Sequence, residues 1–148
     1  MNEAIQNRKA LADYNILETF EAGIELRGFE VKSVRNGKMT LAGSYARVAP
    51  NGVWLLNSNI APYQENNTPE DYEPARTRRL LLKQEQIESL HGKMKSDRLT
   101  LLPLKVYVKH GLIKVELGLG KGLKKYDKRE KIKTRETKRE INRRLKNE

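Results

Sequence analysis

Apolar and polar positions alternate through much of the first 120 residues, a spacing typical of half-buried β-strands. The segments with this pattern are Tyr14–Phe20, Gly23–Leu26, Ser44–Val48, Val53–Ile60, Leu99–Val108 and Leu112–Leu119. We predict that the first two form one long bent strand with a bulge at residues 21–23. The other four predict two hairpins, one across Ala49-Pro50-Asn51-Gly52, whose Pro and Asn-Gly are turn signals, and one across Lys109-His110-Gly111.

Two shorter segments follow helical spacing instead. In Leu82–Met94 the apolar positions recur on one helix face, and Phe29–Arg35 runs up to the stop signal Asn36-Gly37. The stretch Pro62–Pro74 is polar, acidic and rich in turn residues, so we expect a surface loop. Mainly β structure with short helices predicts a small antiparallel barrel of the oligonucleotide-binding type over residues 1–120. The alternative is an α+β sheet with helices on one face.

The last 28 residues, 121–148, carry most of the positive charge. They hold 13 Lys and Arg against five Asp and Glu, a net +8 out of +11 for the whole chain. The tail has few apolar residues, and their burial cannot offset the entropy cost of ordering its backbone. We therefore expect the tail to be disordered in the free protein and to become helical when it binds a polyanion such as RNA. A membrane surface fits less well, because Ile132, Ile141 and Leu145 are too sparse to form a continuous apolar face.

Residue types that support catalysis or metal binding are scarce. The chain has no Cys and only two His, His91 and His110, which excludes disulfides, thiolate sites and cysteine nucleophiles. The glycines at 118, 120 and 122 complete neither a dinucleotide-binding fingerprint nor a P-loop. We therefore expect no enzyme, no cofactor and no metal. Without a signal-like or membrane-spanning apolar run or a heptad pattern, we expect a cytoplasmic protein that is a monomer when free.

A series of motifs runs in order along the chain. They are Tyr14-x-Ile16-x-x-x-Phe20-Glu21-Ala22-Gly23-Ile24-x-Leu26-x-Gly28-x-Glu30-Val31-Lys32-Ser33-x-Arg35, Ser44-Tyr45, Ile60-Ala61-Pro62-Tyr63, Arg76-x-Arg78-Arg79-Leu80-Leu81-Leu82, Pro103-Leu104-Lys105-x-Tyr107, Lys114-Val115-x-Leu117-Gly118 and Tyr126-Asp127-Lys128-Arg129. Together they resemble the small protein B (SsrA-binding protein) family, the bacterial partners of transfer-messenger RNA (tmRNA). The resemblance implies a barrel that binds the tRNA-like domain of tmRNA and delivers it to stalled ribosomes for trans-translation. It also implies that the tail occupies the empty mRNA channel, near rRNA of the decoding region, and that elongation factor Tu accompanies tmRNA.

Carried over position by position, the resemblance implies RNA contacts by Glu21, Leu81 and Lys114. Glu21 would accept hydrogen bonds from base or ribose donors, or position a neighbouring Lys or Arg; the alternative is a capped strand corner. From spacing alone, Leu81 fits the core better than an RNA contact, although alternation in Leu80-Leu81-Leu82 directs at least one of the three outward. Lys114 faces solvent if Ile113 and Val115 face the core.

Further basic residues extend this predicted surface. Lys32 and Arg35 are three apart on a helix and share a face, although a merely solvated face is the alternative. The guanidinium groups of Arg76, Arg78 and Arg79 suit phosphate oxygens and base stacking. In the tail, we expect ribosome binding by Lys121, Lys124, Asp127, Lys128, Arg129, Lys131, Arg135 and Lys138.

The chain departs from the family pattern at Ala12, where an aromatic residue or His is common, and at Leu123, where Lys is common. We therefore do not expect Ala12 to stack on RNA or Leu123 to contact a phosphate. A structural ribosomal protein, with a basic barrel and a tail threaded through rRNA, is the alternative function, because composition alone does not separate it from a delivery factor.

Overall fold

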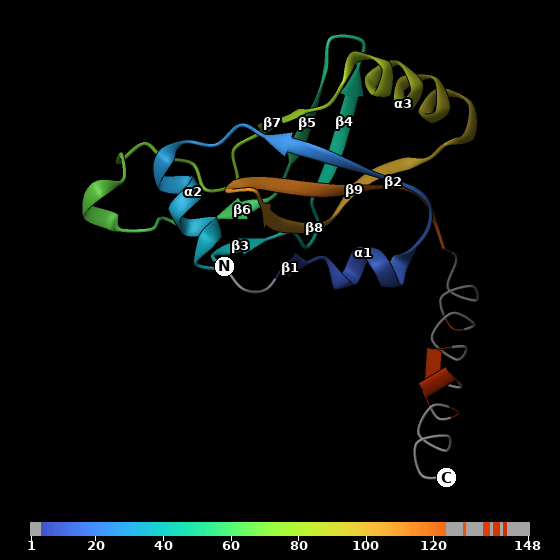
Figure 1. The fold of residues 1–148 in the computed structure, drawn as a ribbon, viewed down its shortest axis with the longest axis horizontal. Coiled ribbons are helices and arrows are strands. Elements are labelled where there is room, and N and C mark those ends of the chain that lie inside the picture. The colour runs from blue at the N-terminus through green and yellow to red at the C-terminus, as the bar shows by residue number, and fades with distance from the viewer. Residues whose placement is uncertain (1–3, 124–128, 130–134, 137, 140, 142–148) are drawn as a thin grey trace.

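Antiparallel strands make up most of the regular secondary structure in the computed structural model, with three α-helices at their margins (Figure 1). It describes residues 4–123 and, beyond them, residues 129, 135, 136, 138, 139 and 141. The strands are β1 Ile5–Gln6, β2 Tyr14–Ile24, β3 Met39–Thr40, β4 Tyr45–Ala49, β5 Gly52–Leu56, β6 Asn59–Ile60, β7 Arg78–Leu81, β8 Thr100–Lys109 and β9 Leu112–Gly122. The helices are α1 Arg8–Asp13, α2 Gly28–Arg35 and α3 Gln84–Asp97, with a 3-10 turn at Glu65–Asn67.

Six strands pair in a closed ring, in the order β8-β4-β5-β7-β2-β9 and back to β8. The longest pairings are those of β9 with β2 and with β8, whereas β4 and β8 meet through a single residue pair, Ala46↔Leu101. β1 adds to the side of β8, and β3 pairs with β6 as a separate ribbon. The antiparallel barrel is thus confirmed, and the alternative of an open α+β sheet is wrong.

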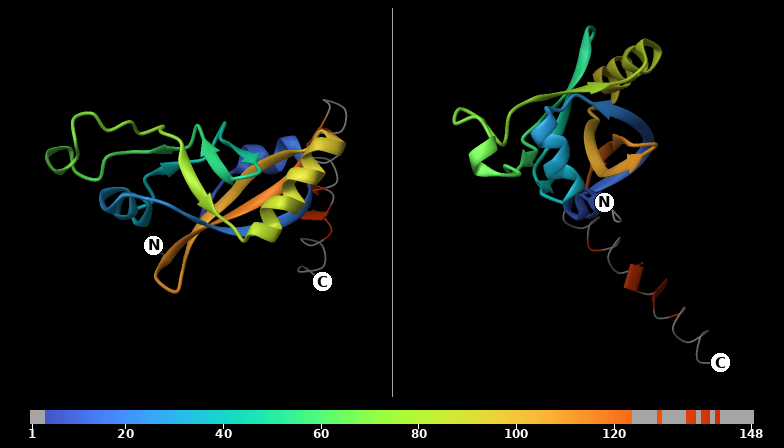
Figure 2. Two further views of the ribbon diagram at one scale, coloured as in Figure 1. Left: turned by 90° about the horizontal axis from the view of Figure 1, so that it is seen from above. Right: turned by 60° about the vertical axis from the view of Figure 1, so that its left-hand side comes forward.

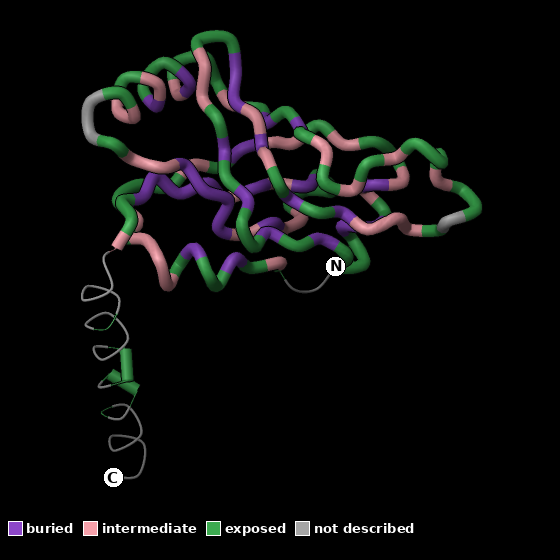
Figure 3. The backbone as a smooth tube through the Cα atoms, turned by 180° about the vertical axis from the view of Figure 1, so that it is seen from behind, coloured by how far each residue is buried: buried purple, intermediate pink, exposed green. Residues whose placement is uncertain are grey.

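The core fills the inside of this ring. Strand residues alternate between buried and exposed positions, as Figure 3 shows along the backbone, because successive side chains point to opposite faces. The side chains with essentially no exposed surface include Val53, Leu55, Leu80, Leu101, Val106, Val115 and Leu117. Burying each such side chain stabilises the fold by about 1.5–3 kcal/mol. α2 and α3 lie toward opposite ends of the barrel (Figures 1 and 2).

The first long strand is confirmed, but the predicted position of its bulge is wrong. β2 is continuous through residues 21–23, and its register shifts instead between Ile16 and Glu18, where Leu17 is 56% exposed. The reason lies on β9: a Cβ at Gly118 would come within 3.1 Å of Ile16 and 2.7 Å of Leu104. Ile16 therefore packs closely over a glycine, and the next residue is displaced outward.

Both predicted hairpins are confirmed, with small changes at their ends. The segment predicted as one strand over Val53–Ile60 is split into β5 and β6 by Asn57, whose positive φ of 63° breaks the extended backbone. α2 is also confirmed. The helix predicted over Leu82–Met94 begins two residues later, at Gln84, and extends to Asp97, because Leu82 still follows the extended course of β7.

α1 was not predicted from the sequence. It begins after Asn7, whose side chain accepts a hydrogen bond from the N–H of Ala10 at 3.2 Å and donates one to the carbonyl of Pro103 at 2.8 Å. Ala10 is the buried residue of this six-residue helix, so the segment has no apolar periodicity to find. The buried Asn7 fixes α1 against β8.

Candidate nucleic-acid interface

Glu21, Leu81 and Lys114 lie together on three neighbouring strands at one end of the barrel. Gly23 on β2 is the direct partner of both Leu81 on β7 and Lys114 on β9, and Glu21 is two residues before Gly23 on the same face. A Cβ at Gly23 would lie 3.3 Å from the Leu81 Cβ, so the missing side chain leaves room between the two neighbours. We call these residues the Gly23 cluster.

The Gly23 cluster faces outward. Leu81 is 47% exposed, which excludes the core position that spacing also allowed, and Lys114 lies between the buried residues Ile113 and Val115 as predicted. Gly23, Leu81 and Lys114 line a shallow groove of about 230 Å³ that continues toward Val31 of α2. The groove therefore combines an apolar floor with a cation at its rim.

Glu21 lies within β2 and not at a strand corner, so that alternative is wrong. Its carboxylate accepts hydrogen bonds from the Tyr107 hydroxyl and from the Lys109 ammonium, whose Nζ is 3.3 Å from both oxygens. The hydrogen bond from Tyr107 lowers the pKa of Glu21, and Lys109 and Lys114 lower it further. The group therefore stays ionised and holds Lys109 beside the groove, while two oxygens leave further lone pairs to accept a ligand donor.

Tyr107 and Lys109 were not predicted to have a role, although Tyr107 belongs to the motif Pro103-Leu104-Lys105-x-Tyr107. Tyr107 is the partner of Lys114 in the β8–β9 register, and the Lys105 ammonium lies 5.6 Å from the centre of its ring. Burial raises the pKa of Tyr107 to about 12, and the hydrogen bond to Glu21 adds to the shift. Tyr107 therefore remains a hydrogen-bond donor, and outward alternation along β8 was the signal that could have found it.

The three arginines before and within β7 do not form one surface. Arg78 has no exposed surface, and its Nε and Nη2 both lie 2.7 Å from Glu30 Oε2. Its other donors reach the hydroxyl of Tyr72 and the carbonyls of Ser58 and Pro74. The prediction that Arg78 contacts RNA is therefore wrong for this structure, because every edge of its guanidinium is directed into the protein.

Arg76 is partly exposed and binds the same buried carboxylate, while Arg79 is exposed. Burial alone raises the pKa of Glu30, but the hydrogen bonds from Arg76, the Arg27 N–H and Arg78 outweigh it and lower the pKa to about 2. Glu30 is in α2, so this ion cluster fastens the helix to the loop that precedes β7. We name Glu30, Tyr72, Arg76 and Arg78 the Glu30 cluster.

The Glu30 cluster sets the position of two further predicted residues on α2. Lys32 and Arg35 are both exposed, and Arg35 Nη2 donates to the carbonyl of Gly111 at 2.8 Å. Gly111 lines the groove of the Gly23 cluster, so Arg35 lies at its edge. Lys32 instead lines a separate groove of about 360 Å³ beside Phe29 and Tyr63.

The predicted tail residues are described in part. Lys121 is an exposed residue of β9, and Arg129, Arg135 and Lys138 are exposed residues with helical backbone. The other four, Lys124, Asp127, Lys128 and Lys131, lie outside the described residues.

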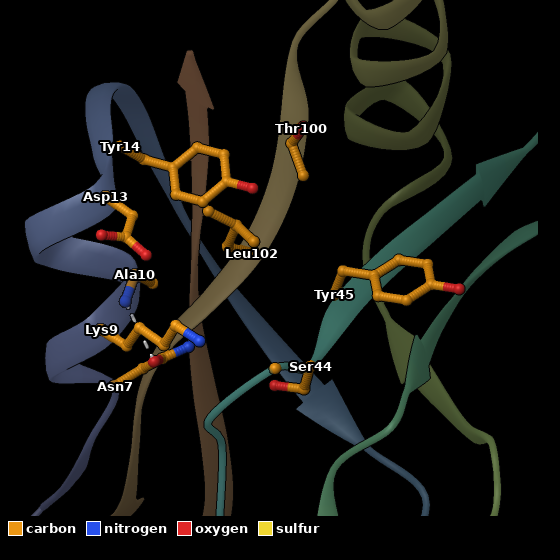
Figure 4. A pocket seen from close by; sticks show the side chains of 10 residues that line it. Asn7, Lys9, Ala10, Asp13, Tyr14, Ser44, Tyr45, Thr100 and Leu102 are labelled. Atoms are coloured by element: carbon orange, nitrogen blue, oxygen red, sulfur yellow. Dashed lines mark hydrogen bonds between the residues drawn. The ribbon is translucent and has the colours of Figure 1, made fainter. Parts of the chain in front are cut away.

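The start of the tail is fixed beside α1, because the Leu123 N–H donates to the carbonyl of Asp13 at 2.9 Å. A pocket of about 280 Å³ opens here between α1, β4 and β8. Figure 4 shows Tyr14 and Asp13 on one side of it and Tyr45 on the other. Ala12, one of the two departures noted in the sequence, falls within α1 between Ala10 and Asp13, which both line this pocket.

A closed antiparallel barrel with cations, an ionised carboxylate and tyrosines on its outer face is typical of nucleic-acid-binding proteins. Among the residues that the structure describes, no group of three or more His, Asp or Glu side chains could hold a metal ion, and none of the described helices is long and apolar enough to cross a bilayer. The family model described as "SmpB protein" matches residues 4–147, and the chain belongs to this family of non-enzymatic RNA-binding proteins.

Individual relatives agree over nearly the whole length. The chain is 51% identical over 146 residues to an SsrA-binding protein of Streptococcus agalactiae, covering 99% of this chain and 94% of the relative. It is 50% identical over 141 residues to that of Trichormus variabilis, covering 95% and 91%. A solved structure described as "tmRNA-SmpB: a journey to the center of the bacterial ribosome" contains a chain that is 43% identical, with a TM-score of 0.68 over 87% of this chain and 94% of that one.

Proposed function

We propose that this chain binds the tRNA-like domain of tmRNA through the Gly23 cluster and delivers it to stalled ribosomes in the cytoplasm for trans-translation. The observation that carries the proposal is the convergence of Glu21, Leu81 and Lys114 around one glycine. The relatives named for SsrA binding, and the solved neighbour described with tmRNA and the ribosome, support this choice of RNA.

The chemistry of the Gly23 cluster suits a folded RNA. Lys114 and Lys109 offer cations to phosphates, the Glu21 carboxylate accepts hydrogen bonds from 2′-hydroxyl or base donors, and Leu81 packs against an exposed base or sugar. Arg35 and Arg79 lie near this surface and add phosphate contacts, while the partly exposed Arg76 contributes its charge from the Glu30 cluster.

In this proposal the tail, residues 121–148, binds the ribosome. Residues 121–148 occupy the empty mRNA channel and the decoding region of rRNA, and elongation factor Tu enters with tmRNA. Lys114 and Gly122 are eight residues apart in β9. At 3.3 Å per residue, the Gly23 cluster and the start of the tail are about 26 Å apart, at opposite ends of the β2–β9 pair. One end can therefore bind tmRNA while the other is directed to the ribosome.

A competition experiment tests the proposal at near-physiological salt. The full chain should prefer the tRNA-like domain of tmRNA to bulk tRNA by about tenfold or more, which is about 1.4 kcal/mol. Lys114→Ala should reduce this preference. Lys95→Ala, an exposed lysine of α3, should leave it unchanged. No preference in the unaltered chain would mean that the partner is wrong.

A further inference from the structure

The largest of these outer grooves, by volume, lies over the β4–β5 hairpin, next to β7. It has a volume of about 430 Å³ and is lined by Arg47, Ala49, Asn51, Trp54, Leu56 and Thr77. The benzo ring of Trp54 lies along the strand over Gly52, where a Cβ would come within 3.1 Å of Trp54 Cη2. The indole therefore packs over Gly52 and forms part of the groove's lining.

An arginine stands on either side of this indole. In the strand register Trp54 on β5 is the direct partner of Arg47 on β4 and of Arg79 on β7. Direct partners have Cβ atoms about 4.5–5.5 Å apart, so the three side chains share one outward face. Both arginines are exposed, and within the described part of the chain neither has an ion pair with a carboxylate.

This combination matches the needs of an unpaired nucleotide. An aromatic face stacks on a base of any sequence, and flanking guanidinium groups neutralise the phosphates on its two sides. The Asn51 amide and the Thr77 hydroxyl lie at the rim, where they can form hydrogen bonds to a base edge. An acidic peptide would use the two cations but would gain nothing from a flat aromatic wall.

We infer that the Arg47–Trp54–Arg79 row is a second RNA-contacting site, which stacks one unpaired base on Trp54 and holds its phosphates with the two arginines. Arg79 and Leu81 are both outward residues of β7, about 7 Å apart along the strand, so the row is continuous with the Gly23 cluster. The inference rests on the proposed function only for the identity of the natural RNA. The site itself takes any single-stranded segment.

Trp54 is the one tryptophan of the chain, so its fluorescence reports directly on this site. The probe is a single-stranded oligouridylate of about six nucleotides, titrated into the full chain. A base stacked on the indole quenches the emission in a saturable manner, whereas a short RNA duplex without unpaired bases does not quench it. Quenching by an oligoglutamate peptide but not by the oligouridylate would overturn the inference in favour of an acidic peptide.

Variants separate stacking from charge, with affinity measured by anisotropy of labelled oligouridylate over a series of salt concentrations. Trp54→Leu lowers affinity about tenfold and leaves the salt slope unchanged, while Trp54→Phe retains most of the affinity. Arg47→Gln and Arg79→Gln each reduce the slope of log K against log salt by about 0.7. Lys95→Gln on α3 changes neither quantity. Equal affinity and slope in all variants would overturn the inference, and the Phe and Gln variants keep the test valid if Trp54→Leu does not fold.

Failure of this inference and failure of the proposed function give different results. Lys114→Ala reduces the preference for the tRNA-like domain but leaves the quenching of Trp54 by oligouridylate intact. An unaltered chain that prefers the tRNA-like domain while Trp54 is not quenched retains the proposed function and loses the second site. A chain that is quenched but shows no preference has the second site and a different natural RNA.

Discussion

Single residues decide which charged groups of this barrel are offered to a ligand and which hold the protein together. Arg78 and Arg79 are adjacent in sequence, but alternation along β7 places the first inside the Glu30 cluster and the second on the outer surface. The same alternation places Glu21 and Tyr107 outward, where the hydrogen bond from Tyr107 lowers the pKa of the Glu21 carboxyl. The exposed carboxylate of Glu21 and the buried carboxylate of Glu30 each lead to a prediction.

Tyr107→Phe removes the hydroxyl that donates to Glu21. The pKa of Glu21 should then rise toward its ordinary value, since the largest cause of its lowering is lost, although Lys109 and Lys114 still lower it. Carbon-13 NMR titration of the Glu21 carboxyl measures the shift directly. Tyr45→Phe, which alters an exposed tyrosine on β4, is the matched control; an unchanged Glu21 titration in Tyr107→Phe would show that the contact is absent in solution.

The Glu30 cluster predicts a loss of stability in acid. The pKa of Glu30 is about 2 in the folded protein against an ordinary 4.5. Because the folded pKa is the lower one, the stabilisation is fully present above about pH 5 and is lost as the pH falls through 4.5 toward 2. Its size is on the order of 3 kcal/mol at neutral pH. Urea unfolding at a series of pH values measures it.

Two substitutions calibrate that experiment. Glu30→Gln should cost about 3–5 kcal/mol at pH 7, because it leaves the buried charge of Arg78 uncompensated, and should flatten the pH dependence. Glu18→Gln breaks an exposed ion pair, 2.6 Å from Lys93, and should cost less than about 1 kcal/mol. Equal costs for the two variants would contradict the role given to the Glu30 cluster.

At the scale of elements, the sequence predicts those whose local signals are strong. Both hairpins and α2 were found because turn residues and stop signals bound them. α1 was missed because Ala10 alone of its residues is buried, and β3 and β6 because two-residue strands have no period. Much of the site could be placed only by the family resemblance, since barrel closure, not local spacing, brings Leu81 and Lys114 to Gly23. Arg78 was misassigned because its partner Glu30 lies 48 residues away and no local pattern links them.

The position of α1 depends on the buried side chain of Asn7, so replacing Asn7 should destabilise this helix in particular. Asn7→Ala deletes both the cap on the Ala10 N–H and the hydrogen bond to Pro103, and should lower the free energy of unfolding by about 2 kcal/mol. Amide hydrogen exchange in α1 should accelerate first. Asn67→Ala, which removes an exposed amide of the 3-10 turn, should change neither.

On the scale of the whole molecule, binding specificity and ribosome engagement are assigned to separate parts. Removal of residues 124–148 takes away 12 Lys and Arg and five Asp and Glu, a net +7 of +11, while leaving the Leu123 contact to Asp13. The shortened chain should keep its preference for the tRNA-like domain and lose rescue of stalled ribosomes. Competition binding and a translation assay on a message without a stop codon measure the two effects.

A scrambled tail of equal composition is the control for charge alone. If it restores rescue, the tail is a non-specific tether. Loss of all RNA discrimination in the shortened chain would contradict the division between barrel and tail. Recovery of the full chain on all ribosomes in cells lacking tmRNA would instead favour the structural ribosomal protein.

The single residue pair that joins β4 to β8 makes the barrel mechanically uneven. β2, β8 and β9 share long ladders, whereas the β4–β5 hairpin closes the ring through Ala46 and Leu101 alone. This seam and the two-pair junction of β2 with β7 are the shortest pairings of the ring, and amide exchange should be faster in β4 than in β9. The hairpin carries Trp54 and Arg47, so these two side chains lie on the part of the ring that can shift most readily to meet a bound RNA.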